Sequence, residues 1–430
     1  MSSFSFQGTW DQVSLLGQLE SVAQALQFEP APRFPDPRPR RVGRIIYLPV
    51  EIAARELAAK AELAGNLAKR GYQVVVGASW NIFVELFLGL PPGVVLFKTL
   101  NAHDANNMHL FQNNGHIVAV LNEEAFGLLP EPWIYRAEMN TQALRLADLI
   151  CAQGERSKAV LKDIGARNVA VTGNPRSRIA SATKGNDILV CMMSGNINGY
   201  LPFPEYMEMT LKSFGKADGD VLRLMREQIS HESAHMKIIL DGIAHLSRTF
   251  PEKRIRVRPH PSERRDVYGA GGNVQLDAQG SLVDSMKDAA VVVFLSGCGS
   301  GLESFLFGVP GVRVGSGGHG ISAELHMQAD TPEDISKAVA AQIESPEMIG
   351  SLAEHFTDPV LDDALVELQE RNSADGTPID MAQEWKKRAD AFQPQGFHHN
   401  KFPETSDERV ADLAGHPVER LGWNTWLLRN

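Results

Sequence analysis

The sequence predicts an α/β protein built from two doubly wound, Rossmann-like domains that face a central cleft. Short, uninterrupted apolar runs recur along the chain. They alternate with longer stretches of helix-forming residues, and Gly, Pro or Asn separate the two kinds of segment. Apolar runs of this kind are typical of parallel strands whose two faces are both covered by helices.

The first α/β series follows an N-terminal extension, residues 1–41. The extension holds an expected helix over Val13–Leu26 and a Pro- and Arg-rich linker over 30–41. The domain over residues 42–180 then begins with the strand Arg44–Leu48 and the helix Glu51–Arg70, which Gly71 ends. Its further expected strands are Gln73–Gly77, Val94–Lys98, Ile117–Leu121, Leu149–Ala152 and Val169–Thr172. A helix ending near Asn113 and a helical stretch from Glu124 to Leu146 are expected between them.

A second α/β series occupies residues 181–350, with the boundary near residues 174–187. A long helix is expected over Val221–Arg248, and further helices after Gly301 and Pro332. The expected strands are Ile188–Met193, Ile255–Arg258, Val291–Leu295 and Gly311–Val314. Residues 351–430 are expected to form C-terminal helices and an irregular, polar tail that wraps back over the body.

Composition limits the class of protein and its partners. The 430 residues include 42 Lys plus Arg and 52 Asp plus Glu, a formal net charge of −10. A chain of this charge is a poor general binder of nucleic acid, which requires a concentrated basic surface. With 43% hydrophobic and 22% charged residues, the chain can bury a large core. Three widely spaced cysteines form no disulfide framework and indicate a reducing compartment.

The sequence carries no signal for export or membrane insertion. The first six residues have neither a basic region nor a long apolar region. The most apolar stretch, Ile82–Leu90, is interrupted by Glu85 and is too short to span a bilayer. We therefore expect a cytoplasmic protein, with peripheral contact to a membrane left open.

The loops that follow strands are the candidate site, because carboxyl ends of parallel strands line the ligand crevice of doubly wound sheets. After the strand Ile255–Arg258, two prolines flank His260 beside Arg258. An imidazole and a guanidinium together can anchor a phosphate. A rigid turn with an exposed histidine explains the same residues.

The strand Val291–Leu295 leads into Ser296–Glu303, which is rich in small residues. A phosphate could approach the backbone and the start of the next helix beside four small residues: Ser296, Gly297, Ser300 and Gly301. Glu303 can accept hydrogen bonds from ribose hydroxyls, or simply complement the helix N-terminus. The loop lacks the Lys of a P-loop, so Walker-type hydrolysis is not indicated.

Further polar residues also follow strands. The loop Ser194–Gly199, with Ser194 and Asn196, can cradle a ligand or form a plain turn. Glu123 and Glu124 stand where a general acid or base would be useful, although acids there also favour a helix N-terminus. Arg176 can reach a substrate anion or pin the domain junction.

Two motif matches carry less weight. His231-Glu232-Ser233-Ala234-His235 fits H-E-x-x-H within the long helix, so a zinc-dependent hydrolase with Glu232 as base is an alternative. Its third ligand is not obvious. Gly315–Gly320 fits G-x-G-x-x-G but lies late in its domain. Cys298 has no arranged base and is interpreted as a small core residue.

The motifs that occur in order over about residues 44–345 are Tyr47–Leu57, Lys69–Gly77, Asn114–Glu124, Gln153–Glu155, Thr172–Arg176, Arg258–Glu263 and Ser300–Pro310. This ordered set resembles the bacterial surface carbohydrate (capsule and lipopolysaccharide) biosynthesis proteins. Two positions depart from the family pattern: Arg178 stands where an Asp is frequent, and Asn122 precedes the acidic pair where an Asp is usual.

The resemblance implies a glycosyltransferase with the GT-B fold, related to transferases that use CMP-Kdo, the nucleotide form of 3-deoxy-octulosonic acid. We identify no metal-binding Asp-x-Asp motif and therefore expect a metal-independent enzyme. The resemblance also implies that the second domain holds the nucleotide, through His260 and the Ser296–Glu303 loop. It makes Glu123 and Glu124 the catalytic candidates and gives Arg55 a role in binding sugar or acceptor. The expected partners are a nucleotide-sugar and a glycan acceptor, which can be lipid-linked, with no cofactor. A non-catalytic protein that binds sugar nucleotides is a further alternative.

Overall fold

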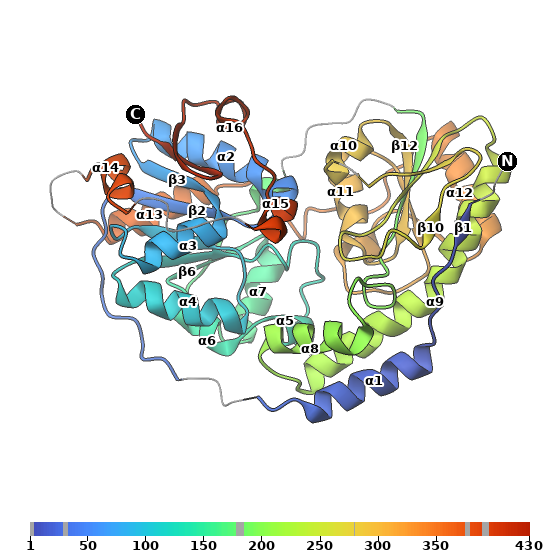
Figure 1. The fold of residues 1–430 in the computed structure, drawn as a ribbon, viewed down its shortest axis with the longest axis horizontal. Coiled ribbons are helices and arrows are strands. Elements are labelled where there is room, and N and C mark those ends of the chain that lie inside the picture. The colour runs from blue at the N-terminus through green and yellow to red at the C-terminus, as the bar shows by residue number, and fades with distance from the viewer. Residues whose placement is uncertain (1–3, 29–32, 178–184, 279, 375–378, 389–394) are drawn as a thin grey trace. The chain divides into compact units, whose positions relative to one another are not determined.

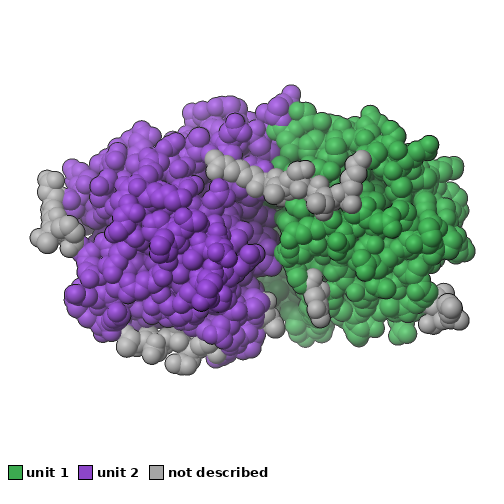
Figure 2. Space-filling model, turned by 90° about the horizontal axis from the view of Figure 1, so that it is seen from above, with its two compact units in different colours: residues 1–30, 125–138, 179–352 green, residues 31–124, 139–178, 353–430 purple. Residues whose placement is uncertain are grey.

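The computed structural model describes residues 4–28, 33–177, 185–278, 280–374, 379–388 and 395–430. The chain forms two compact units (Figure 2). Unit 1 contains residues 1–30, 125–138 and 179–352, and unit 2 contains residues 31–124, 139–178 and 353–430. Part of the expected linker (residues 30–32) and of the expected boundary (residues 178–184, with Arg178) lies outside the described residues.

Unit 1 contains a parallel sheet with the strand order β11-β9-β8-β12-β13-β14. In chain order these strands are numbers 3-2-1-4-5-6, which is the doubly wound Rossmann order. The short strand β1 (Ser5–Phe6) pairs with β10 (Tyr268–Gly269) outside this sheet. The six strands are β8 (Asp187–Cys191), β9 (Ile255–Arg258), β11 (Val274–Leu276), β12 (Ala289–Leu295), β13 (Gly311–Val314) and β14 (Met327–Ala329).

Helices cover the sheet of unit 1, and the longest is α9 (Figure 1). Asp218 caps α9 by accepting the Val221 N–H, and apolar residues three or four positions apart, such as Met236, Ile239 and Ile243, pack on the strands. The described helices of unit 1 are α1 (Gln12–Ala25), α5 (Pro132–Glu138), α8 (Phe203–Phe214), α9 (Gly219–Thr249), α10 (Leu282–Met286), α11 (Gly299–Phe307), η2 (Ile321–Glu324) and α12 (Pro332–Glu344).

Unit 2 contains an eight-stranded sheet in the order β15-β16-β3-β2-β4-β5-β6-β7. Its first six strands in the chain are parallel, and the C-terminal hairpin β15–β16 adds to β3 in antiparallel orientation. The strands are β2 (Ile45–Val50), β3 (Gln73–Ala78), β4 (Val94–Phe97), β5 (Ile117–Leu121), β6 (Leu149–Ala152), β7 (Val169–Val171), β15 (Glu419–Gly422) and β16 (Thr425–Leu428).

Helices from both ends of its sequence cover the sheet of unit 2. Two helices of the C-terminal segment, α13 and α16, pack on α2, and Leu365, Phe402 and Val410 join the buried core. The described helices are α2 (Ala53–Lys69), α3 (Ser79–Phe87), α4 (Ala102–Asn113), α6 (Thr141–Leu146), α7 (Glu155–Asp163), η1 (Pro175–Ser177), α13 (Leu361–Arg371), α14 (Met381–Lys386), α15 (Gly396–Lys401) and α16 (Asp407–Ala414).

The predicted α/β class with two Rossmann-like sheets is confirmed. Two local expectations are wrong. The tail is not irregular, because it holds helices and a hairpin that extends the sheet of unit 2. The helical stretch from Glu124 to Leu146 is two helices, since Asn140 caps a new helix by accepting the N–H groups of Gln142 and Ala143. No helix of the described residues is long and apolar enough to cross a membrane.

Each sheet has a point at which successive connections turn to opposite sides. In unit 1 this point lies between β8 and β12, and in unit 2 it lies between β2 and β4. Doubly wound sheets bind ligands beyond the carboxyl ends of the strands at such a point. The fold therefore directs attention to the loops after β8 and β12, and to Glu51 and Lys98, which follow β2 and β4.

Candidate active site

Glu56 caps the N-terminus of α2 in unit 2 from within the helix. Ile52, at the N-cap position, makes no side-chain capping hydrogen bond. The Glu56 carboxylate instead accepts the backbone N–H groups of Glu51 at 3.1 Å and Ile52 at 3.2 Å. Lys60 Nζ donates to Glu56 at 3.0 Å and to the Pro49 carbonyl oxygen. Burial opposes ionisation of Glu56, but Lys60 and nearby cations outweigh it and lower its pKa to about 2.

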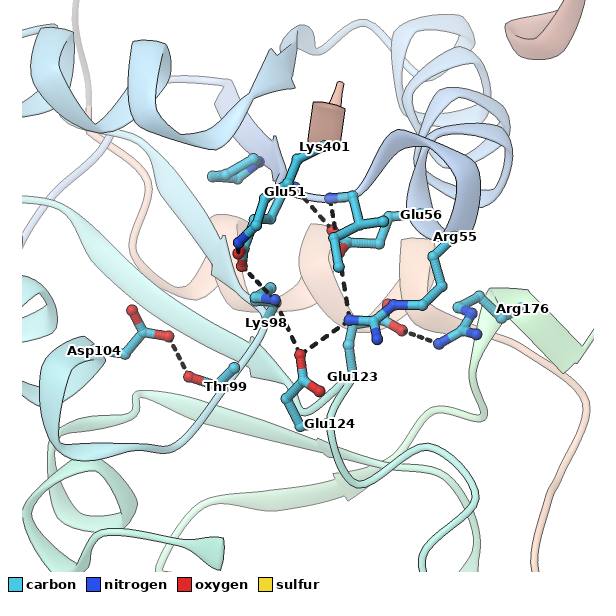
Figure 3. A network of polar contacts seen from close by, with 12 residues as sticks. Glu51, Arg55, Glu56, Lys98, Thr99, Asp104, Glu123, Glu124, Arg176 and Lys401 are labelled. Carbon is cyan, nitrogen blue, oxygen red and sulfur yellow. Dashed lines mark hydrogen bonds and ion pairs between the residues drawn. The ribbon is translucent and has the colours of Figure 1, made fainter. Parts of the chain in front are cut away.

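Lys98 joins this cap to the rest of the network (Figure 3). Its ammonium group pairs with Glu51 and, at 3.0 Å, with Glu124 Oε1. Lys401, at the end of α15, pairs with Glu51 as well. Burial alone would lower the pKa of Lys98, but the surrounding carboxylates, Glu124 foremost, raise it above its ordinary value. Lys98 therefore keeps its charge at neutral pH.

Glu123 and Glu124 follow β5, and each accepts a hydrogen bond from an arginine. Arg55 Nη2 donates to Glu124 at 2.9 Å, and Arg176 Nη1 donates to Glu123 at 3.1 Å (Figure 3). The Glu123 and Arg176 side chains are buried, whereas that of Glu124 is 45% exposed. The Glu123 backbone N–H donates to the Lys98 carbonyl oxygen at 2.7 Å, which fixes the turn. The structure thus brings together the four residues that the sequence singles out in unit 2.

The charge state of Glu124 limits its chemistry. Partial burial would raise the pKa of Glu124, but the adjacent cations Arg55 and Lys98 outweigh it and lower the pKa to about 2. A carboxylate this acidic is a weak general base, because an efficient base titrates near the working pH. A fixed negative charge can, however, stabilise a developing cation or orient a hydroxyl group.

Sequence reasoning missed Glu51, Glu56, Lys98 and Lys401. Glu51 and Glu56 were expected only as residues of the first helix, and Lys98 as the last residue of a strand. The available signal was position, because Glu51 and Lys98 each directly follow a buried strand at the switch point of the sheet. No local signal marks Lys401.

In unit 1, the loops after β12 and β13 pack backbone against backbone. Gly297 has a φ of +82°, and a Cβ there would lie 2.9 Å from the Gly318 Cα. The buried Ser296 hydroxyl donates to the Gly317 carbonyl oxygen at 2.6 Å. Gly318 and Gly320 are explained by this close approach, because a Cβ there would lie 2.5 Å from the Ser296 carbonyl oxygen and 2.1 Å from that of Gly297, respectively.

The start of α11 has two different sides. Gly301 is closely packed, since a Cβ there would lie 2.3 Å from the Phe294 ring. A Cβ at Gly299 would meet nothing within 4 Å. The N-cap residue Cys298 makes no side-chain capping bond, and its buried thiol lies 2.9 Å from the Ser300 hydroxyl. Burial raises the pKa of Cys298, as expected for a core thiol. Glu303 is half-buried in the first turns of α11.

His260 is exposed after β9, and its ring is oriented by Ser262. Nδ1 accepts hydrogen bonds from the Ser262 hydroxyl at 2.7 Å and from the Ser262 N–H at 3.3 Å, which puts the ring proton on Nε2. Arg258 lies in a different network. Its guanidinium donates to Asp277 at 3.1 Å and to Ser285 at 2.9 Å. The pairing of Arg258 with His260 as an anion anchor stays a prediction.

Ser194 and Asn196 make side-chain contacts within unit 1. The Ser194 hydroxyl lies 3.5 Å from the Tyr268 hydroxyl, and the Asn196 side chain donates to Glu232. Glu232 is the acid of the H-E-x-x-H sequence, so its carboxylate is engaged with the loop after β8. Among the described residues, no three His, Cys, Asp or Glu side chains are grouped to hold a metal ion. The geometry therefore gives the zinc-hydrolase alternative no support.

The chain does contain one Asp-x-Asp tripeptide, Asp218-Gly219-Asp220, which was not identified from the sequence. Such tripeptides invite interpretation as metal ligands. Here Asp218 Oδ1 caps α9 by accepting the Val221 N–H at 3.1 Å, and Asp220 pairs with Arg136 at 2.8 Å. Both carboxylates have structural partners.

No protein-family model matches the chain, and no curated protein matches it. Among solved structures it is similar to the MnaA–UDP complex of S. aureus, with 14% identity over 78% of this chain and 98% of that chain and a TM-score of 0.48. It is also similar to a putative UDP-N-acetylglucosamine 2-epimerase of Listeria monocytogenes, with 11% identity, 76% and 95% coverage and a TM-score of 0.49. MurG of Acinetobacter baumannii gives 10% identity, 76% and 99% coverage and a TM-score of 0.38. Similarity of this degree assigns no activity.

Proposed function

We propose that the chain is a GT-B glycosyltransferase of surface polysaccharide biosynthesis that moves a sugar from a nucleotide-sugar to a glycan acceptor. The proposed donor is CMP-Kdo or a related CMP-sugar. One observation carries the proposal: the two switch points have opposite chemical characters. The loops after β8 and β12 of unit 1 are uncharged and glycine-rich, whereas the corresponding positions of unit 2 hold ionised carboxylates and cations.

In this proposal unit 1 binds the nucleotide. The start of α11 offers backbone N–H groups and the positive end of a helix dipole, and Gly299 leaves space for a phosphate to approach. His260 would donate from Nε2 to a phosphate oxygen. These groups would stabilise the negative charge that develops on the leaving phosphate, so the proposed mechanism needs no metal.

Unit 2 would act on the sugar and the acceptor. Loss of a nucleotide from an activated sugar leaves positive charge on the sugar ring, and a fixed carboxylate stabilises it. Glu124, partly exposed and ionised, suits this role. Glu123, held by Arg176, would orient the acceptor hydroxyl, and Arg55 would contact the sugar or acceptor when a substrate loosens its pair with Glu124.

Calorimetric titration of the full chain with CMP, UMP, UDP and GDP tests the first step. We expect saturable binding of CMP, and a Kd about tenfold higher for His260→Ala, which removes one charge-assisted hydrogen bond. His103→Ala, at an exposed histidine of unit 2, is the matched control and should bind as the wild type does. Absence of binding to all four nucleotides would overturn the proposal. Binding without release of CMP from a CMP-sugar in the presence of acceptor would favour the non-catalytic alternative.

A further inference from the structure

One turn of α9 contacts three of the loops at the carboxyl edge of unit 1. Glu232 Oε2 accepts the Asn196 backbone N–H at 3.0 Å, and its other oxygen accepts from the Asn196 side-chain amide, in the loop after β8. His231 Nε2 donates to the Ser296 carbonyl oxygen at 2.8 Å, in the loop after β12. His235 lies against Gly315, after β13, where a Cβ would approach the ring to 2.1 Å. The turn is the H-E-x-x-H sequence itself.

A second buried carboxylate, in the segment that follows β9, holds the same loop after β8. Glu263 accepts the Ser194 backbone N–H and, at 2.7 Å, the Tyr268 hydroxyl. Glu263 is 0% and Glu232 3% exposed. Burying two carboxylates close to one loop is costly unless each accepts several hydrogen bonds. Here the bonds come from the backbone and side chains of the loop, so the carboxylates specify its shape.

Hydrogen bonds also fix the ring orientations of His231 and His235. The Ser296 carbonyl can only accept, so His231 Nε2 carries a proton, and the same argument places a proton on His235 Nδ1, which donates to the His231 carbonyl oxygen at 2.9 Å. Burial lowers the pKa of His231 to about 4, so its ring is neutral at physiological pH. With Nε2 protonated, His231 cannot offer that nitrogen to a metal ion.

We propose that Glu232 is a positioning residue, which with Glu263 holds the Ser194–Gly199 loop in the shape that unit 1 uses to bind a nucleotide. This inference rests on the proposed function. It gives the H-E-x-x-H sequence a role other than metal binding or base catalysis: its turn sets the geometry of the loops that contact the ligand, and Glu232 itself does not touch the nucleotide.

A donor–acceptor exchange tests the inference. Glu232→Gln turns one accepting oxygen toward Asn196 into a donor. Either two donors then meet, or the Asn196 amide turns over and a neutral hydrogen bond replaces the charge-assisted one; both changes loosen the loop. Asn196→Asp creates the opposite fault, because two carboxylates then face each other. In the double variant N196D/E232Q the NH2 of the introduced amide donates to the introduced carboxylate, and the single carbonyl oxygen of that amide still accepts the backbone N–H of position 196. Asp241→Asn, in an exposed pair with Lys237 on the same helix, is the matched control.

Two readouts separate this inference from the proposed function. Hydrogen–deuterium exchange of peptides covering 192–200, without ligand, measures how firmly the loop is held. Calorimetry with CMP measures whether the loop shape supports binding. At about pH 9, where Glu232 is ionised, we expect for each single variant about tenfold faster exchange and about a tenfold higher Kd, the equivalent of one charge-assisted hydrogen bond, with the double variant within about threefold of wild type.

Four outcomes are decisive. Rescue of both readouts in the double variant supports the inference. Faster exchange with unchanged CMP affinity overturns it, because the loop would then not serve the nucleotide. Unchanged exchange in both single variants also overturns it. If the wild-type chain binds none of the four nucleotides, the proposed function fails and the ligand role fails with it, while the exchange data still decide whether Glu232 holds the loop.

Discussion

The carboxylate of Glu124 accepts a hydrogen bond from the Arg55 guanidinium at 2.9 Å, although 69 residues separate the two in sequence. Arg55 stands in the first turn of α2, and Glu124 follows β5, so the pair forms only once the sheet of unit 2 has assembled. Lys98 donates to the same carboxylate oxygen at 3.0 Å. Glu124 is therefore an ionised, oriented group rather than a titrating one.

Replacing Glu124 with Gln should abolish most of the transfer activity. The substitution keeps the shape but removes the charge that would stabilise the sugar cation, so we expect kcat to fall by about 10²–10⁴-fold, with the Kd for CMP unchanged. Release of CMP from a CMP-sugar, compared with calorimetric binding, separates the two effects. Glu155→Gln, at an exposed glutamate of α7, is the control, and equal losses in both variants would contradict the role of Glu124.

Replacing Glu56 with Gln should destabilise unit 2. It leaves buried Lys60 without its carboxylate partner, a change that costs about 3–5 kcal/mol in comparable buried pairs. Urea unfolding of the full chain measures the effect, and Glu62→Gln, at an exposed position of the same helix, should lie within about 0.5 kcal/mol of wild type.

The effect of Glu56→Gln on the free energy of unfolding should depend on pH. Because the pKa of Glu56 is about 2 in the folded chain, below its ordinary value of 4.5, its stabilising effect is complete above about pH 4.5 and disappears as the pH falls toward 2. The difference between wild type and Glu56→Gln should therefore shrink on acidification. A difference that grows on acidification would contradict the ion-pair account.

Two glycines of unit 1 should respond differently to alanine. Gly297→Ala places a Cβ 2.9 Å from the Gly318 Cα at a φ of +82°, so we expect a loss of stability of about 1–2 kcal/mol or more. Gly299→Ala adds a methyl group where no atom lies within 4 Å, and the melting temperature should not fall. If a phosphate docks there, Gly299→Ala should nevertheless weaken CMP binding. Unchanged CMP affinity in this variant would exclude the start of α11 as the phosphate site.

The stability of unit 1 should decline with rising pH because of Glu232. Burial raises the pKa of Glu232 to about 8, and repulsion from Glu263 raises it further. Hydrogen bonds from Asn196 and Ile197 lower the pKa but do not outweigh burial. Tyr206 of α8 lies close enough to interact with Glu232. The raised pKa means that the contribution of Glu232 is complete below about pH 4.5 and is lost as the pH rises toward 8. Urea unfolding of wild type and Glu232→Gln should show wild type losing stability relative to the variant between pH 5 and 8. A constant difference would contradict this.

Much of the fold could be predicted because its strands are locally encoded. β9 and β13 have the expected bounds, since in each short strand apolar residues alternate with Arg and a Pro or Gly follows directly. The hairpin β15–β16 could not be predicted in the same way. The strand β15 (Glu419–Gly422) is mostly polar and half-exposed. Its partner strand β16 joins the sheet by pairing with β3, which is far away in sequence. Tertiary pairing of this kind leaves no periodic signal.

The candidate-site residues that lie directly after strands could be predicted from the sequence. Those that join the site through contacts distant in sequence could not. Glu123, Glu124 and Arg176 were identified from their positions after strands, and the structure brings them together with Arg55. Arg258 was placed by sequence adjacency to His260, yet strand pleating directs its guanidinium to Asp277 and Ser285. Lys401 reaches Glu51 from the C-terminal segment, which no local pattern reveals.

Hydrogen–deuterium exchange of the full chain with and without saturating CMP tests the central claim most directly, because it reports where the nucleotide binds. We expect slower exchange in peptides that cover 296–301 at the start of α11 and 192–200 after β8, with exchange in α12 unchanged. Slower exchange confined to peptides of unit 2, or no change anywhere at a CMP concentration that saturates the calorimetric signal, would contradict it.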